Sequence, residues 1–169
     1  MKVWITIVGK SPFAVINPIW IACKSGEFIP EKVYLIWNDA VKGEKEMVVK
    51  AIKVILKNYG VPEPEIIADD STKVHEEDFR RLAELLLSIR RKELREGNEI
   101  AIDMTPGRKF MSAIAMFMGV AKSLKDKVHR VYYLHLSDQR YLNYPLILIP
   151  HKLQKLYEMR RELGVTSKE

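Results

Sequence analysis

The chain has 169 residues, 47% of them hydrophobic and 30% charged, as in a soluble globular protein, and its net charge of +6 favours an anionic partner unless solvated lysines account for it. The lone Cys23 excludes a disulfide framework and a CxxC metal pair, and the four histidines lack zinc-ligand spacing. No apolar run approaches the ~20 residues of a membrane span. The N-terminal apolar run is too short for a signal peptide, so we expect a cytoplasmic protein without metal, cofactor or membrane partner. Gln is scarce and Lys and Glu are abundant, a composition that hints at a thermophile.

Apolar, β-branched runs alternate along the chain with segments of helical periodicity. In chain order the sequence predicts strand 2–8, helix 18–25, strand 32–37, helix 43–60, strand 65–68, helix 73–96, strand 99–103, helix 108–124, strands 128–136 and 146–149, helix 151–163, and a frayed tail. Strands that alternate with helices form a mostly parallel sheet covered on both faces. We therefore expect a Rossmann-like α/β fold, with an open six-stranded sheet, in one domain spanning residues 1–169.

The segment after the first strand contains two prolines. Pro18 would sit badly inside a helix that began at Pro12, because proline lacks the amide hydrogen that the helix interior needs. We expect a loop from Gly9 to Ile16, with Asn17 as the N-cap of a short helix that begins at Pro18.

Ligands of open α/β sheets bind beyond the carboxyl ends of the strands, which directs attention to the residues that follow each strand. These residues are rich in donors and cations and poor in paired carboxylates. They are Gly9, Lys10, Ser11 and Pro12 after the first strand, Asn38 and Asp39 after the second, residues 104–109 after the fourth, and residues 137–140 after the fifth.

The turn "TPGRK" joins the fourth strand to a helix. Thr105 is a suitable N-cap, with Pro106 at the first helical position and Gly107 allowing close approach. The amides of residues 107–109 at a helix N-terminus, with the charges of Arg108 and Lys109, are typical of an anion site. The alternative is a capped corner with two solvated cations. Neither a GxxxxGK[ST] loop nor a GxGxxG motif is present.

The turn "GKSP" places Ser11 directly after a buried strand. This serine could be a nucleophile, a phosphate donor or a turn former. No GxSxG motif surrounds it and no His-Asp partner pair is evident, so a hydrogen-bond donor to phosphate or ribose is the better interpretation. Asp103, with no second carboxylate nearby, is expected to fix its turn.

Together the two turns resemble those of the CARF domains, the CRISPR-associated Rossmann-fold sensors of cyclic oligoadenylates. "GKSPFAVIN" resembles the family's G-[ST]-S-P-x-[AV]-[VL]-[VT]-[TE] loop, and "IDMTPGRKFMSAIA" resembles its D-x-T-G-G-T-K-x-[MS] signature. Pro106 and Arg108 depart from the usual glycine and threonine. Because no segment long enough for an effector domain follows the last predicted strand, the chain is similar to the stand-alone ring nucleases, which bind and cut cyclic tetra-adenylate.

The resemblance implies a homodimer with cyclic tetra-adenylate across its two-fold axis, and no other nucleic-acid partner. It implies metal-independent cleavage, in which a ribose 2′-OH attacks the adjacent phosphodiester and yields linear di-adenylate with a 2′,3′-cyclic phosphate. Lys109 would stabilise the developing charge, and Ser11 would orient the ribose or phosphate. The ligand-binding residues implied are Gly9, Lys10, Ser11, Pro12, Asn38, Asp39, Thr105, Pro106, Gly107, Arg108 and Lys109.

Three alternatives remain open at this point. A non-catalytic sensor would use the same pocket and signal to a partner. A nucleic-acid-binding regulator would use the basic segments 90–95 and 152–161. An unrelated nucleotide enzyme would need a metal or a mononucleotide.

Overall fold

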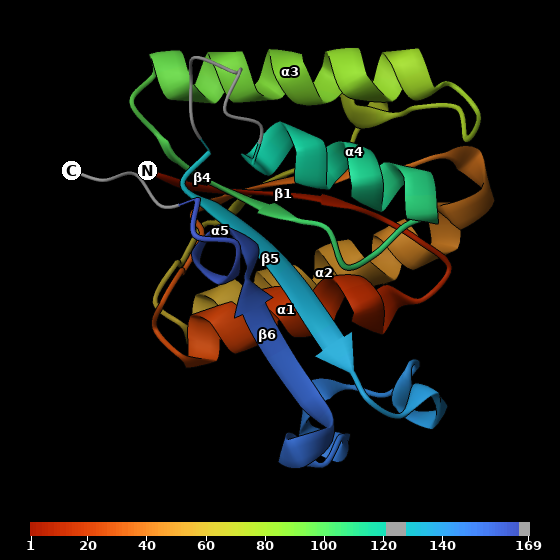
Figure 1. The fold of residues 1–169 in the computed structure, drawn as a ribbon, viewed down its shortest axis with the longest axis vertical. Helices are drawn as coiled ribbons and strands as arrows, with labels where there is room; N and C mark the ends of the chain where they lie inside the picture. Colours follow the sequence, from red (N-terminus) through yellow and green to blue (C-terminus); the bar gives the residue numbers. More distant parts are fainter. Residues whose placement is uncertain (121–127, 166–169) are drawn as a thin grey trace.

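The computed structural model describes residues 1–120 and 128–165, which form a six-stranded sheet in the order β3-β2-β1-β4-β5-β6 (Figure 1). The strands are β1 (Lys2–Ile7), β2 (Lys32–Ile36), β3 (Glu65–Ile67), β4 (Glu99–Asp103), β5 (Arg130–Leu136) and β6 (Gln154–Glu158). The pairs among β1 to β5 are parallel and β6 is antiparallel to β5. The predicted Rossmann-like, mostly parallel sheet is confirmed.

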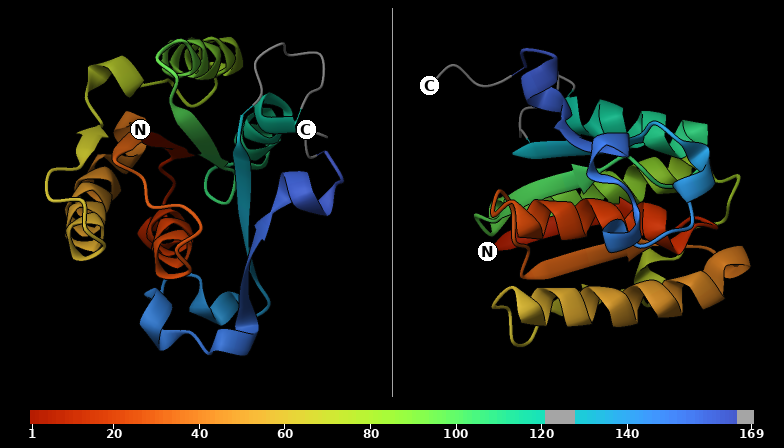
Figure 2. Two further views of the ribbon diagram at one scale, coloured as in Figure 1. Left: turned by 90° about the vertical axis from the view of Figure 1, so that its left-hand side faces the viewer. Right: turned by 90° about the horizontal axis from the view of Figure 1, so that it is seen from below.

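Helices cover both faces of this sheet (Figure 2). The helices are α1 (Pro12–Lys24), α2 (Lys42–Asn58), α3 (Phe79–Arg95), α4 (Lys109–Val120) and the short α5 (Met159–Glu162). α1 and α2 pack on one face and α3 and α4 on the other. Side chains alternate accordingly along β1: Trp4 enters the core beneath α1 and α2, whereas Ile5 and Ile7 enter the core beneath α3 and α4. None of the described helices is long and apolar enough to cross a membrane.

The prediction that the first helix begins at Pro18 is wrong, because α1 starts at Pro12 and contains Pro18. Asn17 does not cap this helix: its side-chain amide donates to the Tyr144 carbonyl at 3.0 Å and accepts from the Leu146 amide at 2.9 Å. An internal proline costs about 3 kcal/mol. Burial of one helix face against the sheet outweighs that cost, since Val15 and Ile19 are fully buried.

The predictions for residues 146–163 are also wrong. Residues Leu146–Leu148 form a 3-10 turn between two prolines, and the sixth strand is Gln154–Glu158, inside the predicted helix 151–163. This strand forms because β5 offers a free edge, with Leu134 opposite Leu156 and Tyr133 opposite Tyr157. Within the predicted helix 151–163, residues His151–Leu153 form a 3-10 turn and Met159–Glu162 form the short α5.

The long predicted helix 73–96 begins later than expected, at Phe79. Val74 instead donates to the Trp37 carbonyl at 2.8 Å, which extends the sheet edge, and Asp78 caps α3 by accepting from the Arg81 amide at 2.9 Å. The segment 73–78 is therefore held beside the end of β2. The predicted end of α4 at residue 124 lies outside the described residues.

Candidate functional site

The turns after β1 and β4 meet at the carboxyl edge of the sheet. These neighbouring strands lead to helices on opposite faces, which is the arrangement of a topological switch point. Gly9 and Gly107 touch, because a Cβ on Gly9 would lie 3.2 Å from the Gly107 nitrogen. Gly107 has a φ of +93°, a conformation that other residues rarely adopt. The two turns thus form one surface.

A cavity of about 400 Å³, the central hollow, opens between these turns. Its rim carries the exposed cations Lys10 and Arg108. The predicted residues that line it are Gly9, Lys10, Ser11, Asn38, Thr105, Pro106, Gly107 and Arg108. The structure therefore brings together residues that lie up to a hundred positions apart in the sequence.

The other predicted residues lie around the central hollow. Lys109 lines an open depression of about 670 Å³, the outer hollow, with Met116 and Phe117 of α4; Thr105 and Gly107 border both hollows. Asp39 lines a third cavity of about 360 Å³, the side hollow, and pairs with Lys73 at 2.7 Å. Pro12 begins α1 and lines none of these three hollows. Ser11 and Lys109 of one chain thus face different hollows.

The start of α4 differs from the prediction. Thr105 does not cap the helix, which begins at Lys109, and the Arg108 carbonyl accepts the first bonds from the Met111 and Ser112 amides. The Thr105 hydroxyl instead accepts from the Leu134 amide at 2.8 Å, which ties the turn to β5. Pro106 is consequently part of a tight turn ahead of the helix and is buried.

Asp103 anchors this turn from below, as expected. Its carboxyl group is almost completely buried and accepts from the Thr6 hydroxyl at 3.0 Å and the Thr105 amide at 2.9 Å. Burial raises the pKa of Asp103 to about 7, against the opposing effect of these hydrogen bonds. The carboxyl group therefore fixes the backbone from beneath the turn.

The side chains of Ser11 and Asn38 have partners within the chain. The Ser11 hydroxyl donates to the Leu142 carbonyl at 3.0 Å, so the loop after β5 closes one side of the central hollow. The Asn38 side-chain oxygen accepts from the Ala40 amide at 3.0 Å and caps a 3-10 turn. The Ser11 oxygen still has lone pairs that can accept a hydrogen bond from a ligand hydroxyl.

Sequence reasoning missed Glu76. The sequence places this residue in the first turn of the predicted helix 73–96. In the structure it lines both the central and the side hollow, and its Oε1 pairs with Arg108 Nη2 at 2.5 Å. No sequence motif marks it, because the backbone pairing of Val74 with Trp37 is what brings it to the site. In the described part of the chain, no three His, Cys, Asp or Glu side chains converge as a metal ion would require.

No protein-family model and no curated protein matches the sequence. Among solved structures, the chain is similar to Enterococcus italicus Csm6 bound to cyclic hexa-2′-fluoro-hexa-dAMP, with a TM-score of 0.62 and 16% identity over 96% of this chain and 44% of that chain. It is also similar to a type III CRISPR defence DNA nuclease activated by cyclic oligoadenylate, with a TM-score of 0.50 and 16% identity over 80% of this chain and 19% of that chain. The chain thus spans less than half the length of either, and the likeness shows a shared fold.

Proposed function

We propose that this chain is a CARF-type domain that binds a cyclic oligoadenylate, specifically cyclic tetra-adenylate, over the central hollow. The observation that carries the proposal is the contact between the "GKSP" and "TPGRK" turns, which surrounds a cavity of about 400 Å³ with Lys10 and Arg108 at its rim. A fold shared with Csm6, whose structure holds a cyclic oligonucleotide, supports the assignment.

The groups around the hollow suit a phosphodiester ligand. Arg108 offers a planar fork that can hold a phosphate through two hydrogen bonds, and the N-terminus of α4 adds a positive dipole beside it. Pro106 has no amide hydrogen to offer, so Arg108 compensates for a lost donor at this turn. Asn38 and Asp39, next to the hollow, would contact the ribose or the adenine.

The separation of Ser11 from Lys109 favours a dimeric site. The outer hollow is open, and Phe117, which lines it together with Met116, is 56% exposed. We propose that two chains pair about a two-fold axis next to α4. A two-fold symmetric ring could then contact both central hollows and both copies of Lys109.

We further propose that the bound ring is cleaved. A ribose 2′-OH attacks the adjacent phosphorus and forms the 2′,3′-cyclic phosphate, and the bond to the 5′-oxygen breaks, with the proton of the attacking hydroxyl ultimately transferred to the leaving 5′-oxygen. This reaction depends on placing the 2′-OH in line and on neutralising charge on the phosphorane. Ser11 would accept a hydrogen bond from the ribose and position it, and Lys109 would stabilise the phosphorane. The alternative, a non-catalytic sensor, uses the same contacts and differs only in the fate of the ring.

Binding measurements test the ligand class. Calorimetry with cyclic tetra-adenylate, cyclic hexa-adenylate, ATP and NAD should show the tightest binding for the tetra-adenylate, at one ring per two chains. Lys109→Ala should weaken binding, whereas Arg91→Ala, which removes a cation on α3 away from the hollow, should leave it unchanged. Tighter binding of ATP or NAD would refute the proposal.

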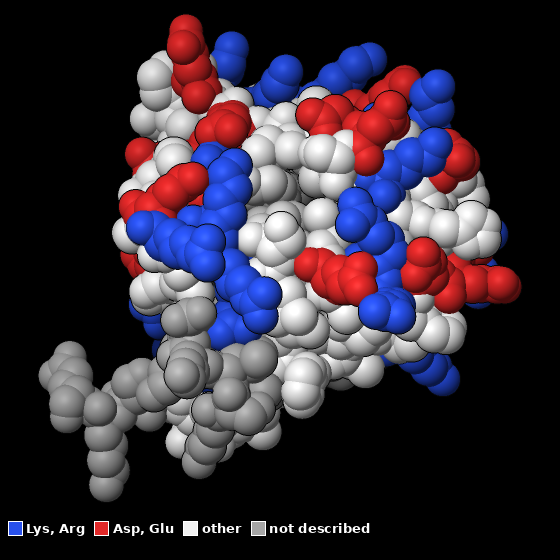
Figure 3. Space-filling view, turned by 90° about the horizontal axis from the view of Figure 1, so that it is seen from above, with Lys and Arg blue, Asp and Glu red and all other residues white. Residues whose placement is uncertain are grey.

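The surface charge around residues 90–95 gives less support to the nucleic-acid-binding role that was considered for this segment. On the face that carries α3 and α4, Lys and Arg side chains are interleaved with Asp and Glu (Figure 3). The depression beside Arg91, Lys92 and Arg95 is also lined by Glu84 and Glu96. A phosphate backbone is best followed by an uninterrupted basic stripe, which this face lacks over its described residues.

A further inference from the structure

Arg108 forms an ion pair with a carboxylate at the edge of the central hollow. Its Nη2 lies 2.5 Å from Glu76 Oε1, and both side chains border the central hollow. The two residues come from different parts of the sheet edge: Arg108 from the β4-α4 turn and Glu76 from the segment 73–78 that is pinned beside the end of β2. The ion pair therefore joins two segments that both line the hollow.

A guanidinium fork binds carboxylate and phosphate with the same geometry. A phosphate that uses Arg108 must therefore displace Glu76 or share the guanidinium with it. We propose that Glu76 is a built-in competitor for phosphate at Arg108 and that it sets the affinity of the site for anionic ligands. This inference rests on the proposed function for the identity of the natural ligand, although the competition itself concerns any phosphate at Arg108.

The Glu76 carboxylate that a phosphate displaces from Arg108 does not have to stay buried. Glu76 also lines the side hollow, whose lining includes the donors Lys73 and His75 and the carboxylates of Asp39 and Glu77. Lys73 is 37% exposed there and pairs with Asp39 at 2.7 Å. Because the Glu76 side chain is 33% exposed, a carboxylate released from Arg108 can be solvated by water.

The solvent exposure of Arg108 and Glu76 determines how much Glu76 lowers the affinity for a phosphate. The side chain of Arg108 is 60% exposed and that of Glu76 is 33% exposed, so solvent screens their interaction. Partly exposed pairs of this kind lower a competing affinity by about two- to fivefold. The loss applies to any ligand whose phosphate uses Arg108, whether a small anion or a ring held by both turns. Glu76 therefore lowers the affinity for each by a similar factor and leaves their ratio unchanged.

The test compares ligand affinities of four variants by calorimetry, with cyclic tetra-adenylate and inorganic pyrophosphate as probes. Glu76→Gln should bind each probe about two- to fivefold more tightly than the unaltered protein. Glu84→Gln is the matched control, because it removes the same charge from an exposed ion pair with Arg80 on α3. Its affinities should be unchanged. In an Arg108→Met background, Glu76→Gln should have no effect.

The outcomes separate this inference from the proposed function. An unchanged or weakened affinity of Glu76→Gln for both probes, or the same gain in the Arg108→Met background, would overturn the competitor role even if the ring binds. Failure of the ring to bind any variant, with a gain for pyrophosphate in Glu76→Gln, would overturn the proposed ligand and support the competitor. If neither probe binds any variant, both are overturned. Unchanged melting temperatures would show that the variants fold.

Discussion

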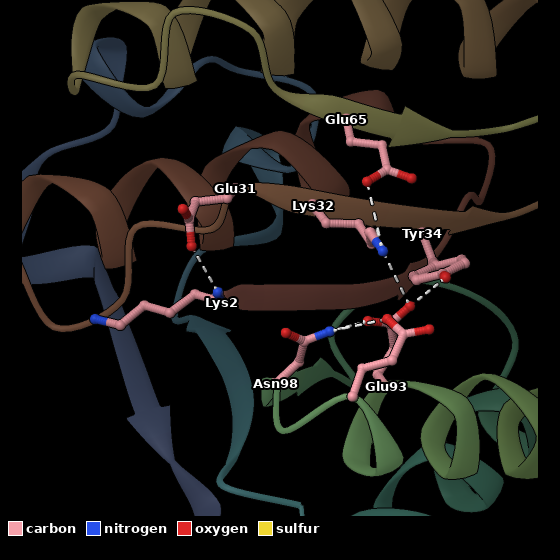
Figure 4. Close-up of polar contacts among 8 residues, drawn as sticks. Lys2, Glu31, Lys32, Tyr34, Glu65, Glu93 and Asn98 are labelled. Carbon is pink, nitrogen blue, oxygen red and sulfur yellow. Dashed lines mark hydrogen bonds and ion pairs between the residues drawn. The ribbon is translucent and has the colours of Figure 1, made fainter.

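The buried carboxylate of Glu93 holds together the sheet edge opposite the central hollow. It is fully buried near the end of α3 and accepts from Tyr34 Oη at 2.5 Å, Asn98 Nδ2 at 2.6 Å and Lys32 Nζ at 3.3 Å (Figure 4). Burial alone would raise the pKa of Glu93, but the hydrogen bonds from Tyr34, Asn98 and Lys32 outweigh it, and the pKa lies below its usual range. The group is therefore ionised and satisfied.

Replacing Glu93 by alanine should be severely destabilising. The change leaves the hydroxyl of Tyr34 and the amide of Asn98 without this acceptor, and it leaves the nearly buried Lys32 ammonium with only Glu65, at 3.4 Å, whose side chain is 54% exposed. Removal of one partner from a buried ion pair costs about 3–5 kcal/mol. Glu65→Ala removes the exposed partner of the same lysine and should cost about 0–1 kcal/mol.

Urea denaturation measures the free energies of unfolding of the Glu93→Ala and Glu65→Ala variants. The Glu93 site lies at the amino ends of the strands, so ligand affinity of the folded variant should be unchanged. A loss below about 1 kcal/mol for Glu93→Ala, or an equal loss for Glu65→Ala, would refute the reasoning that burial makes this carboxylate decisive.

Three further predictions concern the site and its support. The pKa of Asp103 is raised to about 7, so the folded state keeps a proton that the unfolded state releases above the ordinary pKa of an aspartate. The free energy of unfolding should therefore fall as the pH rises toward 7. Asp103→Asn should remove that pH dependence in urea titrations at several pH values. Gly107→Ala should cost about 1–2 kcal/mol and weaken ligand binding, because alanine is strained at a φ of +93° and its Cβ would lie 3.4 Å from Ile7 and Met111; unaltered stability and affinity would contradict this. Gly119→Ala should cost about 1–3 kcal/mol in the same assay, because its Cβ would collide with Val131 and push α4 off β5, whereas Ala113→Ser, at an exposed position of the same helix, should cost little.

The buried strands could be predicted because parallel strands covered on both faces are nearly continuous apolar runs, as "KVWITIV" is. Their order in the chain, alternating with helices, was enough to predict the parallel part of the sheet, β1 to β5. The helix around Pro18 could not be predicted, since its stability comes from burial and from the loop that Asn17 holds. Strand β6 could not be predicted either, because "QKLYE" gains its conformation by pairing with β5.

The residues of the site also divide into those that the sequence predicts and those that it does not. The residues that line the central hollow mostly follow strands directly, so the sheet rule finds Ser11 and Arg108 from the sequence. Glu76 follows no strand, and only the pairing of its segment with Trp37 carries it to the hollow. The placement of Lys109 in a different hollow from Ser11 likewise depends on α4 beginning at Lys109 itself, three residues after the proline that was expected to start the helix.

Cleavage of labelled cyclic tetra-adenylate tests the central claim most directly. Incubated with this protein in EDTA, the ring should be converted to linear di-adenylate with a 2′,3′-cyclic phosphate, and Lys109→Ala and Ser11→Ala should slow the conversion at saturating protein. A ring that binds but stays intact would contradict the cleavage proposal and leave a sensor. A ring that does not bind would contradict the account as a whole.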